Sequence, residues 1–363
     1  MAEITKSIPF DDLELPALTP KFSWIVAMIF SVLFFLVLDL VLGSVTIPVT
    51  EVIKILTGQG SENIAWLTIV QNIRIPKALT AILAGSALSV SGLQMQTLFR
   101  NPLAGPSVLG VTSGASFGVA ILMLGTGHVT SNVAIRQLGI GGSWLIILAA
   151  AIGSAIVLLM VIGLSLRIRD NVILLIVGLM LSNLIIAVVS IWQYFSEPEQ
   201  IQDYLMWTFG SLGGVSSAQL NILSIVILMG IALAFISSKF LNLLLLGESY
   251  AASMGLNLKV VKILIIISTS LLAGAITGFC GPIGFIGIAV PHLCRAVLNT
   301  SDHRVLVPSC CLLGATIMLV CDIVAQLPGH HSVLPINAVT AIIGSPVVMW
   351  VILKQKNIRS SFS

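Results

Sequence analysis

Charged side chains are scarce in this sequence. Asp, Glu, Lys and Arg make up only 9% of the 363 residues, while hydrophobic residues make up 57%. Soluble globular domains carry roughly 25% charged residues, which cover their water-facing surface. A chain with so little charge cannot be an ordinary soluble domain, and we expect most of its surface to face lipid.

Three further absences narrow the function classes. The net charge of +3 comes without a basic stripe, so we expect no nucleic-acid partner. No lysine follows a glycine, which excludes the G-x-x-x-x-G-K-[ST] loop that cradles ATP phosphates. The five cysteines show no zinc-site or disulfide spacing, and we predict that they are apolar packing residues. They are Cys280, Cys294, Cys310, Cys311 and Cys321.

Long apolar runs are what the sequence has instead. A transmembrane helix needs about 20 apolar residues, and hydropathy predicts about ten such helices. They lie near 23–42, 75–98, 107–124, 143–165, 172–195, 219–238, 260–279, 283–298, 305–325 and 336–353. The fold class that we predict is an all-α integral membrane protein. A single transmembrane domain at 22–354 follows a polar segment at 1–21 and precedes a tail at 355–363.

The distribution of Lys and Arg predicts that both termini are cytoplasmic. With ten helices and the N-terminus inside, the outer segments hold only four of the 17 basic residues. These four are Lys54, Arg74, Lys77 and Arg136. In the outer segment at 196–218, the stretch 203–212 is too short to span, and we expect a short helix lying at the outer face.

Small residues recur at helical spacing in two places. Gly110, Gly114 and Gly118 repeat every four positions, which favours close helix packing. A second set, Gly278, Gly281, Gly284 and Gly287, repeats every three and includes Pro282. Such a run favours broken backbone, which membranes tolerate only when it is buried in protein or lines a cavity. We therefore expect a re-entrant turn near a transport path.

Several ordered motifs carry a family resemblance. They are RIPK at 74–77, AGSALSVSGLQMQ at 84–96, LFRNPLAGPSVLGVTSG at 98–114, LGE at 246–248, AASMG at 251–255, GPIGFIG at 281–287 and VPH at 290–292. Together they resemble the permease family of ABC importers for iron–siderophores, haem and cobalamin. The closing segment, with Leu334, Pro335, Thr340, Ala341 and Trp350, also fits that family.

The resemblance implies a complete transport assembly in the bacterial cytoplasmic (inner) membrane. A second permease copy forms a homodimer with this chain, two cytoplasmic ATPase subunits drive it, and an extracytoplasmic binding protein delivers ligand. ATP and Mg²⁺ bind the ATPase subunits, and this chain binds no cofactor directly. The expected cargo is a bulky metal chelate, a ferric siderophore first, with cobalamin or haem as the alternative of the same family.

The resemblance also assigns roles to residues. The ATPase-coupling segment comprises Gly247, Glu248, Ala251, Ala252, Ser253 and Gly255. Arg74 and Lys77 are expected to face outward as an exposed basic pair that docks the binding protein. Gln326 stands where relatives often carry arginine, which weakens docking at that corner and leaves Asp322 without an adjacent cation.

Other polar residues are candidates for the translocation path or its gate. This set comprises Gln94, Gln96, Gly281, Pro282, Gly284 and Gly287. The two glutamines could equally form hydrogen bonds between helices. Asp39 lies in the first apolar run, near its outer end, where we expect interfacial exposure. His330 and His331 are expected to be loop residues, and His292 to fix backbone geometry.

Two function classes compete with the importer permease. An ion-coupled secondary transporter would need paired ionisable residues near the membrane midplane and no ATPase-docking loop. An intramembrane enzyme would need a nucleophile–base pair or metal ligands within the spans. The sequence offers few intramembrane ionisable residues and no convincing catalytic constellation, so both rank below the permease.

Overall fold

The computed structural model describes most of the chain, namely residues 22–43, 45–61, 63–125, 140–168, 170–326 and 333–360. All regular secondary structure in these ranges is helical. The first half comprises α1 (Phe22–Val41), α2 (Val49–Leu56), α3 (Ile64–Ile69), a π-helical turn η2 (Val70–Arg74), α4 (Ile75–Leu98), a 3-10 turn η3 (Pro106–Leu109), α5 (Val111–Leu124), α7 (Ile140–Arg167) and α8 (Asn171–Phe195). The second half comprises α9 (Pro198–Thr208), α10 (Ser217–Ile236), α11 (Ser238–Leu246), α12 (Glu248–Ser253), α13 (Leu258–Cys280), α14 (Ile286–Leu298), α15 (His303–Ala325) and α16 (Ile336–Ser360).

Each of the ten predicted apolar runs falls on a described helix. Within the described residues, seven helical stretches are long and apolar enough to cross a membrane: Ser23–Val41, Ile64–Leu98, Ser143–Arg167, Asn171–Phe195, Ser217–Ile236, Leu258–Cys280 and His303–Ala325. Three apolar helices are shorter: Val111–Leu124, Ile286–Leu298 and Ile336–Trp350. The prediction of an all-α membrane protein is confirmed.

The second span begins earlier than predicted. Continuous helix runs over 35 residues, Ile64–Leu98, through α3, η2 and α4. Hydropathy placed its start near residue 75 because Gln71, Asn72 and Arg74 interrupt the apolar pattern. These polar residues lie in the π-helical turn, which joins the two α-helices without a break.

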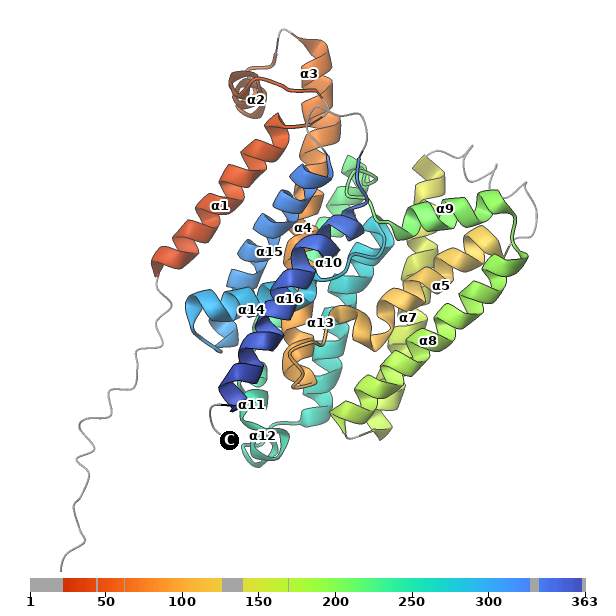
Figure 1. Cartoon of the computed structure of the whole chain (residues 1–363), viewed down its shortest axis with the longest axis vertical. Coiled ribbons are helices and arrows are strands. Elements are labelled where there is room, and N and C mark those ends of the chain that lie inside the picture. The colour runs from red at the N-terminus through yellow and green to blue at the C-terminus, as the bar shows by residue number, and fades with distance from the viewer. Residues whose placement is uncertain are drawn as a thin grey trace, which may run out of the picture.

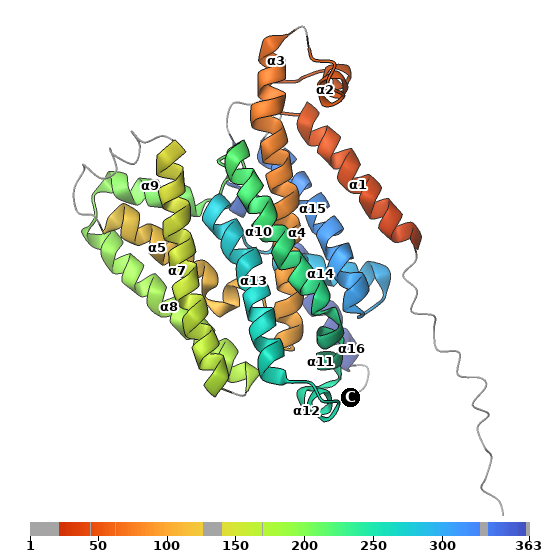
Figure 2. The ribbon, with the colours of Figure 1, turned by 180° about the vertical axis from the view of Figure 1, so that it is seen from behind.

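Helix α4 forms the centre of the bundle, between α10 and α13 on one side and α14 and α15 on the other (Figures 1 and 2). Its buried face is made largely of Ala, Gly and Ser, which lets neighbouring backbones come close. A Cβ added at Gly85 would lie 2.1 Å from the carbonyl oxygen of Gly314 in α15. A Cβ added at Gly92 would lie 1.7 Å from the carbonyl oxygen of Gly287 in α14. Only glycine fits at these two contacts.

The glycines of α5 pack it tightly against α7, as their spacing predicted. An added Cβ at Gly114 would lie 2.6 Å from the carbonyl oxygen of Gly153, and one at Gly118 would lie 2.0 Å from that of Ala149. Gly110 differs from the other two, because it precedes the helix and has a φ of +76°. It ends the 3-10 turn rather than packing inside a helix.

The two ends of the bundle carry different structures. Helices α2 and α3 lie at one end, and α11 and α12 lie at the other (Figure 1). Helix α9 lies across the bundle toward the α2–α3 end. It is the short helix expected at 203–212, and it begins and ends slightly earlier, at Pro198–Thr208. Pro198 at its start and a capping box between Glu197 and Gln200 fix where it begins.

Candidate functional site

The predicted ATPase-coupling segment is a short helix between two glycines. Helix α12 spans only six residues, Glu248–Ser253. Gly247 before it has a φ of +121° and Gly255 after it has a φ of +84°, conformations that side-chain-bearing residues rarely adopt. These glycines turn the chain sharply away from α11 and back into α13.

Three side chains, which we name the α12 anchor, hold this helix: Asn171, Glu248 and Lys262. Lys262 Nζ lies 3.3 Å from Glu248 Oε1, and the amide of Asn171 donates a hydrogen bond to the same carboxylate. Asn171 also donates to the carbonyl oxygen of Leu98, 2.6 Å away. The anchor therefore connects α12 to the ends of α4, α8 and α13. Sequence reasoning missed the pairing of Asn171 and Lys262 with Glu248, since nothing in the local pattern distinguishes them from other polar residues near helix ends.

The two faces of α12 differ sharply. Ala251 is completely buried, so the expectation that it faces a partner is wrong. Ala252, Ser253 and Gly255 are exposed, as expected. Around them lie large apolar side chains that are more than half exposed: Leu246, Tyr250 and Met254. An apolar surface at a helix end, outside the spans, is typical of a protein–protein contact.

Arg74 is buried inside the chain, which contradicts its expected outward exposure. Its side chain is 8% exposed and donates to the carbonyl oxygens of Leu40, Val41 and Val45. The bonds to Leu40 and Val41 are 2.6 and 2.9 Å long. Arg74 therefore satisfies backbone carbonyls at the end of α1, which would otherwise lack partners.

Lys77 is also engaged within the chain. Its Nζ lies 3.0 Å from Asp322 Oδ1, and its side chain is 16% exposed. The expectation that Asp322 lacks a neighbouring cation is therefore wrong. The two residues lie 245 positions apart in sequence, so a single sequence gives no signal for their pairing.

Gln326 connects the two buried carboxylates. Its side-chain nitrogen donates to Asp39 Oδ1 at 2.7 Å and to Asp322 Oδ2 at 2.9 Å. Asp39 is 2% exposed, so the expected interfacial exposure is wrong. We name this set the α1–α15 cluster: Asp39, Arg74, Lys77, Asp322 and Gln326. Four of its members, all except Asp322, line a cavity of about 320 Å³.

Gln94 and Gln96 lie inside the bundle and not on an open path. Gln94 is fully buried, and its Oε1 accepts hydrogen bonds from Ser268 and Thr269 of α13. Gln96 donates to the carbonyl oxygen of Ile288 and accepts from Arg295 at 2.7 Å. Both glutamines connect α4 to neighbouring helices, which is the second of the two roles that the sequence allowed.

The glycine- and proline-rich segment after α13 is a break in the helix, as predicted. Helix α13 ends at Cys280, Gly281 has a φ of +77°, and α14 begins at Ile286. Asn337 of α16 accepts a hydrogen bond from the backbone N–H of Gly284, 3.1 Å away. Sequence reasoning missed this stabilising contact from Asn337.

A cavity of about 310 Å³ lies beside this break. Pro282, Gly284 and Gly287 line it, while Gly281 packs against the carbonyl oxygen of Trp207 instead. The other lining residues come from α4, the η3–α5 region, the break itself, α14 and α16: Leu88, Gly105, Pro106, Ser107, Thr112, Ile283, Phe285, Ile288 and Asn337. None of these side chains is charged, so the cavity can recognise shape but not charge.

Histidine and cysteine form no metal centre in the described ranges. No group of three or more His, Cys, Asp or Glu side chains there is arranged to hold an ion. All five cysteines are free thiols, and four are buried, as the packing prediction requires. His292 contacts the carbonyl oxygen of Pro102 at 2.7 Å, which fits its expected structural role. His330 and His331 lie outside the described residues.

Comparison with known proteins agrees with this architecture. A family model described as the FecCD transport family matches residues 30–354. The hemin transport system permease protein HmuU of Yersinia pestis is 35% identical over 301 residues, which cover 83% of this chain and 87% of that protein. The vitamin B12 import system permease protein BtuC of Salmonella typhi is 37% identical over 288 residues, which cover 78% of this chain and 83% of that protein.

A solved structure gives the same result at the level of the fold. It captures an inward-facing conformation of a transporter assigned to the metal-chelate ABC type. The TM-score is 0.79 at 26% identity, over 92% of this chain and 99% of the other. Taken with the helical membrane fold, these matches establish that the chain belongs to the FecCD transport family and is a multi-pass inner-membrane permease subunit of the ABC-importer type.

Proposed function

We propose that this permease, as a homodimer, carries a bulky metal chelate into the cytoplasm by alternating access. Two ATPase subunits that bind ATP and Mg²⁺ drive the cycle, and an extracytoplasmic binding protein supplies the ligand. The observation that carries the proposal is the uncharged cavity beside the helix break. A wall with no charge suits large ligands that must pass without binding tightly.

The α12 segment is the proposed ATPase contact. Its exposed face presents Tyr250 and Met254 together with the small residues Ala252, Ser253 and Gly255. The α12 anchor ties the opposite face to the ends of α4, α8 and α13. A partner that moves α12 would therefore move three spanning segments with it, which is what coupling of ATP hydrolysis to transport requires.

The binding protein is proposed to dock at the α2–α3 end. The buried hydrogen bonds of Arg74 and the ion pair of Lys77 would have to break for these residues to act as a docking pair. The proposal therefore places the contact on the surrounding surfaces of α2, α3 and α9, which lie at the same end (Figure 2).

Three chelates are candidates for the cargo. A ferric siderophore is the leading one, and the named relatives transport hemin and vitamin B12. All three are metal complexes too large for a small-ion site, and the described residues offer no cluster that would strip the metal. We expect the intact complex to cross.

Ligand-stimulated ATP hydrolysis tests this proposal. The permease, its ATPase and its binding protein are reconstituted in vesicles and supplied with a ferric siderophore, haem or cobalamin. We expect one chelate to raise both ATP hydrolysis and uptake. Uptake that persists without ATP, or that follows an imposed ion gradient, would show that the chain is a secondary transporter instead.

Substitution at Gly284 tests the cavity. Gly284→Trp should fill it and reduce uptake at least tenfold, while the vesicles still contain the assembled complex. Gly284→Ala is the matched control, because its Cβ would lie 3.5 Å from Asn337 Oδ1, an ordinary contact distance. Equal uptake by both variants would place the transport path elsewhere.

A further inference from the structure

Helix α11 lies directly before the proposed ATPase contact and is held by a network of hydrogen bonds. Asn242 of α11 donates from its amide nitrogen to Asp302 Oδ1 at 2.6 Å. Its amide oxygen accepts from the backbone N–H of His303 at 2.9 Å and lies 2.7 Å from His303 Nδ1. On the other side of the ring, His303 Nε2 lies 2.7 Å from Thr97 Oγ1 in α4. We name these four residues the His303 network: Thr97, Asn242, Asp302 and His303.

The partners of His303 fix which of its ring nitrogens carries a hydrogen. The amide of Asn242 has only one possible orientation, because its nitrogen donates to a carboxylate and its oxygen accepts from a backbone N–H. His303 Nδ1 must therefore carry a hydrogen and donate it to that oxygen. In a neutral imidazole the other nitrogen is an acceptor, and the hydroxyl of Thr97 is placed to donate to it. One ring is thus bonded to α11 and to α4 at the same time.

The connection between α4 and His303 is buried. His303 is 1% exposed and Thr97 is 3% exposed. Separating two buried polar groups leaves both without a partner, which costs more than breaking the same bond in water. A shift of His303 should therefore move Thr97 with it.

The end of α4 is connected to other helices near the same point. Arg100, just after α4, donates to the carbonyl oxygen of Leu244 in α11 at 3.0 Å. Gln96 accepts a hydrogen bond from Arg295 of α14 at 2.7 Å. His303 adds the start of α15 to these contacts. The last turn of α4 is therefore where α11, α14 and α15 are joined by polar bonds.

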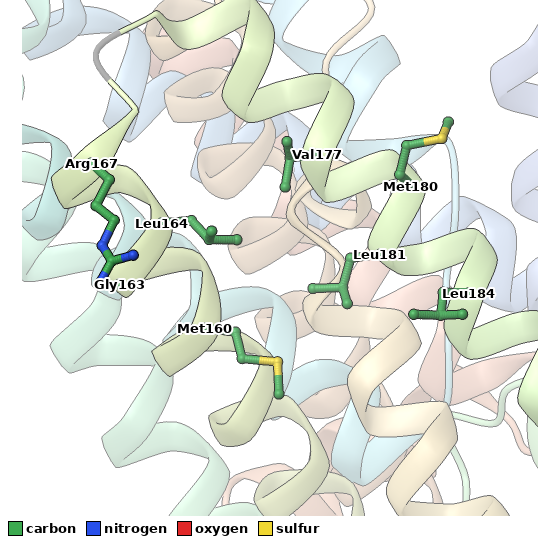
Figure 3. A pocket seen from close by; sticks show the side chains of 8 residues that line it. All are labelled: Met160, Gly163, Leu164, Arg167, Val177, Met180, Leu181 and Leu184. Carbon is green, nitrogen blue, oxygen red and sulfur yellow. The ribbon is translucent and has the colours of Figure 1, made fainter.

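The junction between α7 and α8 is of a different kind. Eight residues line the space between these two helices, and seven of them are apolar or glycine (Figure 3). Leu164 of α7 and Leu181 of α8 are examples, and Arg167 is the exception. Apolar contacts have no preferred direction, whereas a hydrogen bond does. The His303 network should therefore transmit a movement more faithfully than the space between α7 and α8.

We propose that His303 is a positioning residue that transmits movement of the ATPase-contact segment to α4 and α15. Gly247 is the single residue between α11 and α12, so ATPase subunits that displace α12 also displace α11. The two bonds of the imidazole carry that displacement to the last turn of α4, and its backbone carries it to the first turn of α15. The α12 anchor reaches α4, α8 and α13, and the His303 network adds α15. This inference rests on the proposed function, in which α12 is the ATPase contact.

Two substitutions at His303 divide the network into its two bonds. His303→Asn places an amide nitrogen near the position of Nδ1, so it keeps the bond to Asn242 and loses the one to Thr97. His303→Gln reaches the position of Nε2, so it keeps the contact with Thr97 and loses the one to Asn242. Ser309→Ala is the matched control. It removes the hydrogen bond of a buried serine to the carbonyl oxygen of Val305, which lies within α15 itself.

Amide exchange measures the transmission without any cargo. The assembled complex of permease and ATPase is compared with and without ATP and vanadate. Nucleotide should change exchange at 247–255 in every variant. In the natural sequence and in Ser309→Ala it should also change exchange at 94–101 and 303–309. Either substitution at His303 should reduce that second response about fivefold, the factor that one ordinary hydrogen bond contributes.

The ratio of ATP hydrolysed to cargo imported gives the functional readout. Vesicles that contain the complete importer are supplied with a ferric siderophore, haem or cobalamin. Both His303 variants should hydrolyse about fivefold more ATP per molecule imported than the natural sequence. A residue that only stabilised the fold would lower the unfolding midpoint and leave this ratio unchanged. Thr97→Val cuts the same bond as His303→Asn but keeps the imidazole, so it gives the same comparison if the His303 variants do not assemble.

Two results would overturn the inference, and they have different meanings. One is a full response at 94–101 and 303–309 in both His303 variants and in Thr97→Val, while 247–255 still responds. Movement would then travel by another route, and the proposed function would stand. The other is the absence of any nucleotide response at 247–255 in the natural sequence. That result would show that α12 is not the ATPase contact, and the inference would fail together with the proposed function.

Discussion

The α1–α15 cluster and the α12 anchor are both built around an ion pair, yet they serve different ends. In the α1–α15 cluster, Asp39 and Asp322 are each 2% exposed. In the α12 anchor, the Glu248 side chain is 29% exposed. The first joins long helices that are already apolar enough for a membrane. The second holds a six-residue helix, which is too short to be stable by itself.

The difference shows that burial decides what an ion pair does. A deeply buried pair is costly to break because the remaining charge has no water around it. A pair with one exposed partner can separate at lower cost because water solvates that partner, which in the α12 anchor is Glu248, while the Lys262 side chain is 7% exposed. We therefore expect the α1–α15 cluster to determine global stability, and the α12 anchor to determine the position of one segment.

Asp322→Ala should give the largest effect. The change removes the carboxylate that forms an ion pair with Lys77, whose side chain is 16% exposed, and breaking a buried pair costs about 3–5 kcal/mol. Unfolding of the purified protein in detergent, followed by helical circular dichroism, measures this loss. The double variant Lys77→Met with Asp322→Leu should recover most of it, since both charges of the pair are then removed together. A stable single variant would show that water reaches Lys77.

Glu248→Arg should give a smaller and local effect. It places a second cation beside Lys262 and removes the acceptor for Asn171, at a cost of about 1–2 kcal/mol. Amide exchange across 247–255 should accelerate and ATPase association should weaken, while global unfolding is unchanged. Exchanging both charges, Glu248→Lys with Lys262→Glu, is the matched rescue. A global loss of stability would remove the distinction between the two regions.

Lys54→Ala should give the smallest effect. The pair between Lys54 and Glu51 is more exposed than the other two, with the Lys54 side chain 51% exposed. Hydrogen bonds from Lys54 and Ser61 lower the pKa of Glu51. Any stabilisation from this group is therefore present at neutral pH and fades as the pH falls through its pKa in the folded protein. At neutral pH we expect no measurable change in the unfolding midpoint, and a clear loss would mean that α2 carries more of the fold than its exposure suggests.

Sequence reasoning located the helices well because lipid imposes a length and a polarity on them. The α12 segment and the helix break at Gly281 were also predicted, since motif and glycine spacing are local signals. The buried environment of Arg74, Lys77 and Asp39 was not predicted. These residues meet through contacts between α1, α4 and α15, and their exposure depends on that packing. Two local features indicated that these residues could meet: Asp39 lies in an apolar run, and Gln326 lies four residues after Asp322.

The contact between Gly92 and Gly287 has a mechanical consequence. Two backbones meet there with no side chain between them, so the junction has no rotamers through which it can yield gradually. It either stays closed or separates completely. During a transport cycle, the start of α14 should therefore travel with the middle of α4 as a single pivot. The flexible element would be the unwound stretch from Gly281 to Phe285, immediately before it.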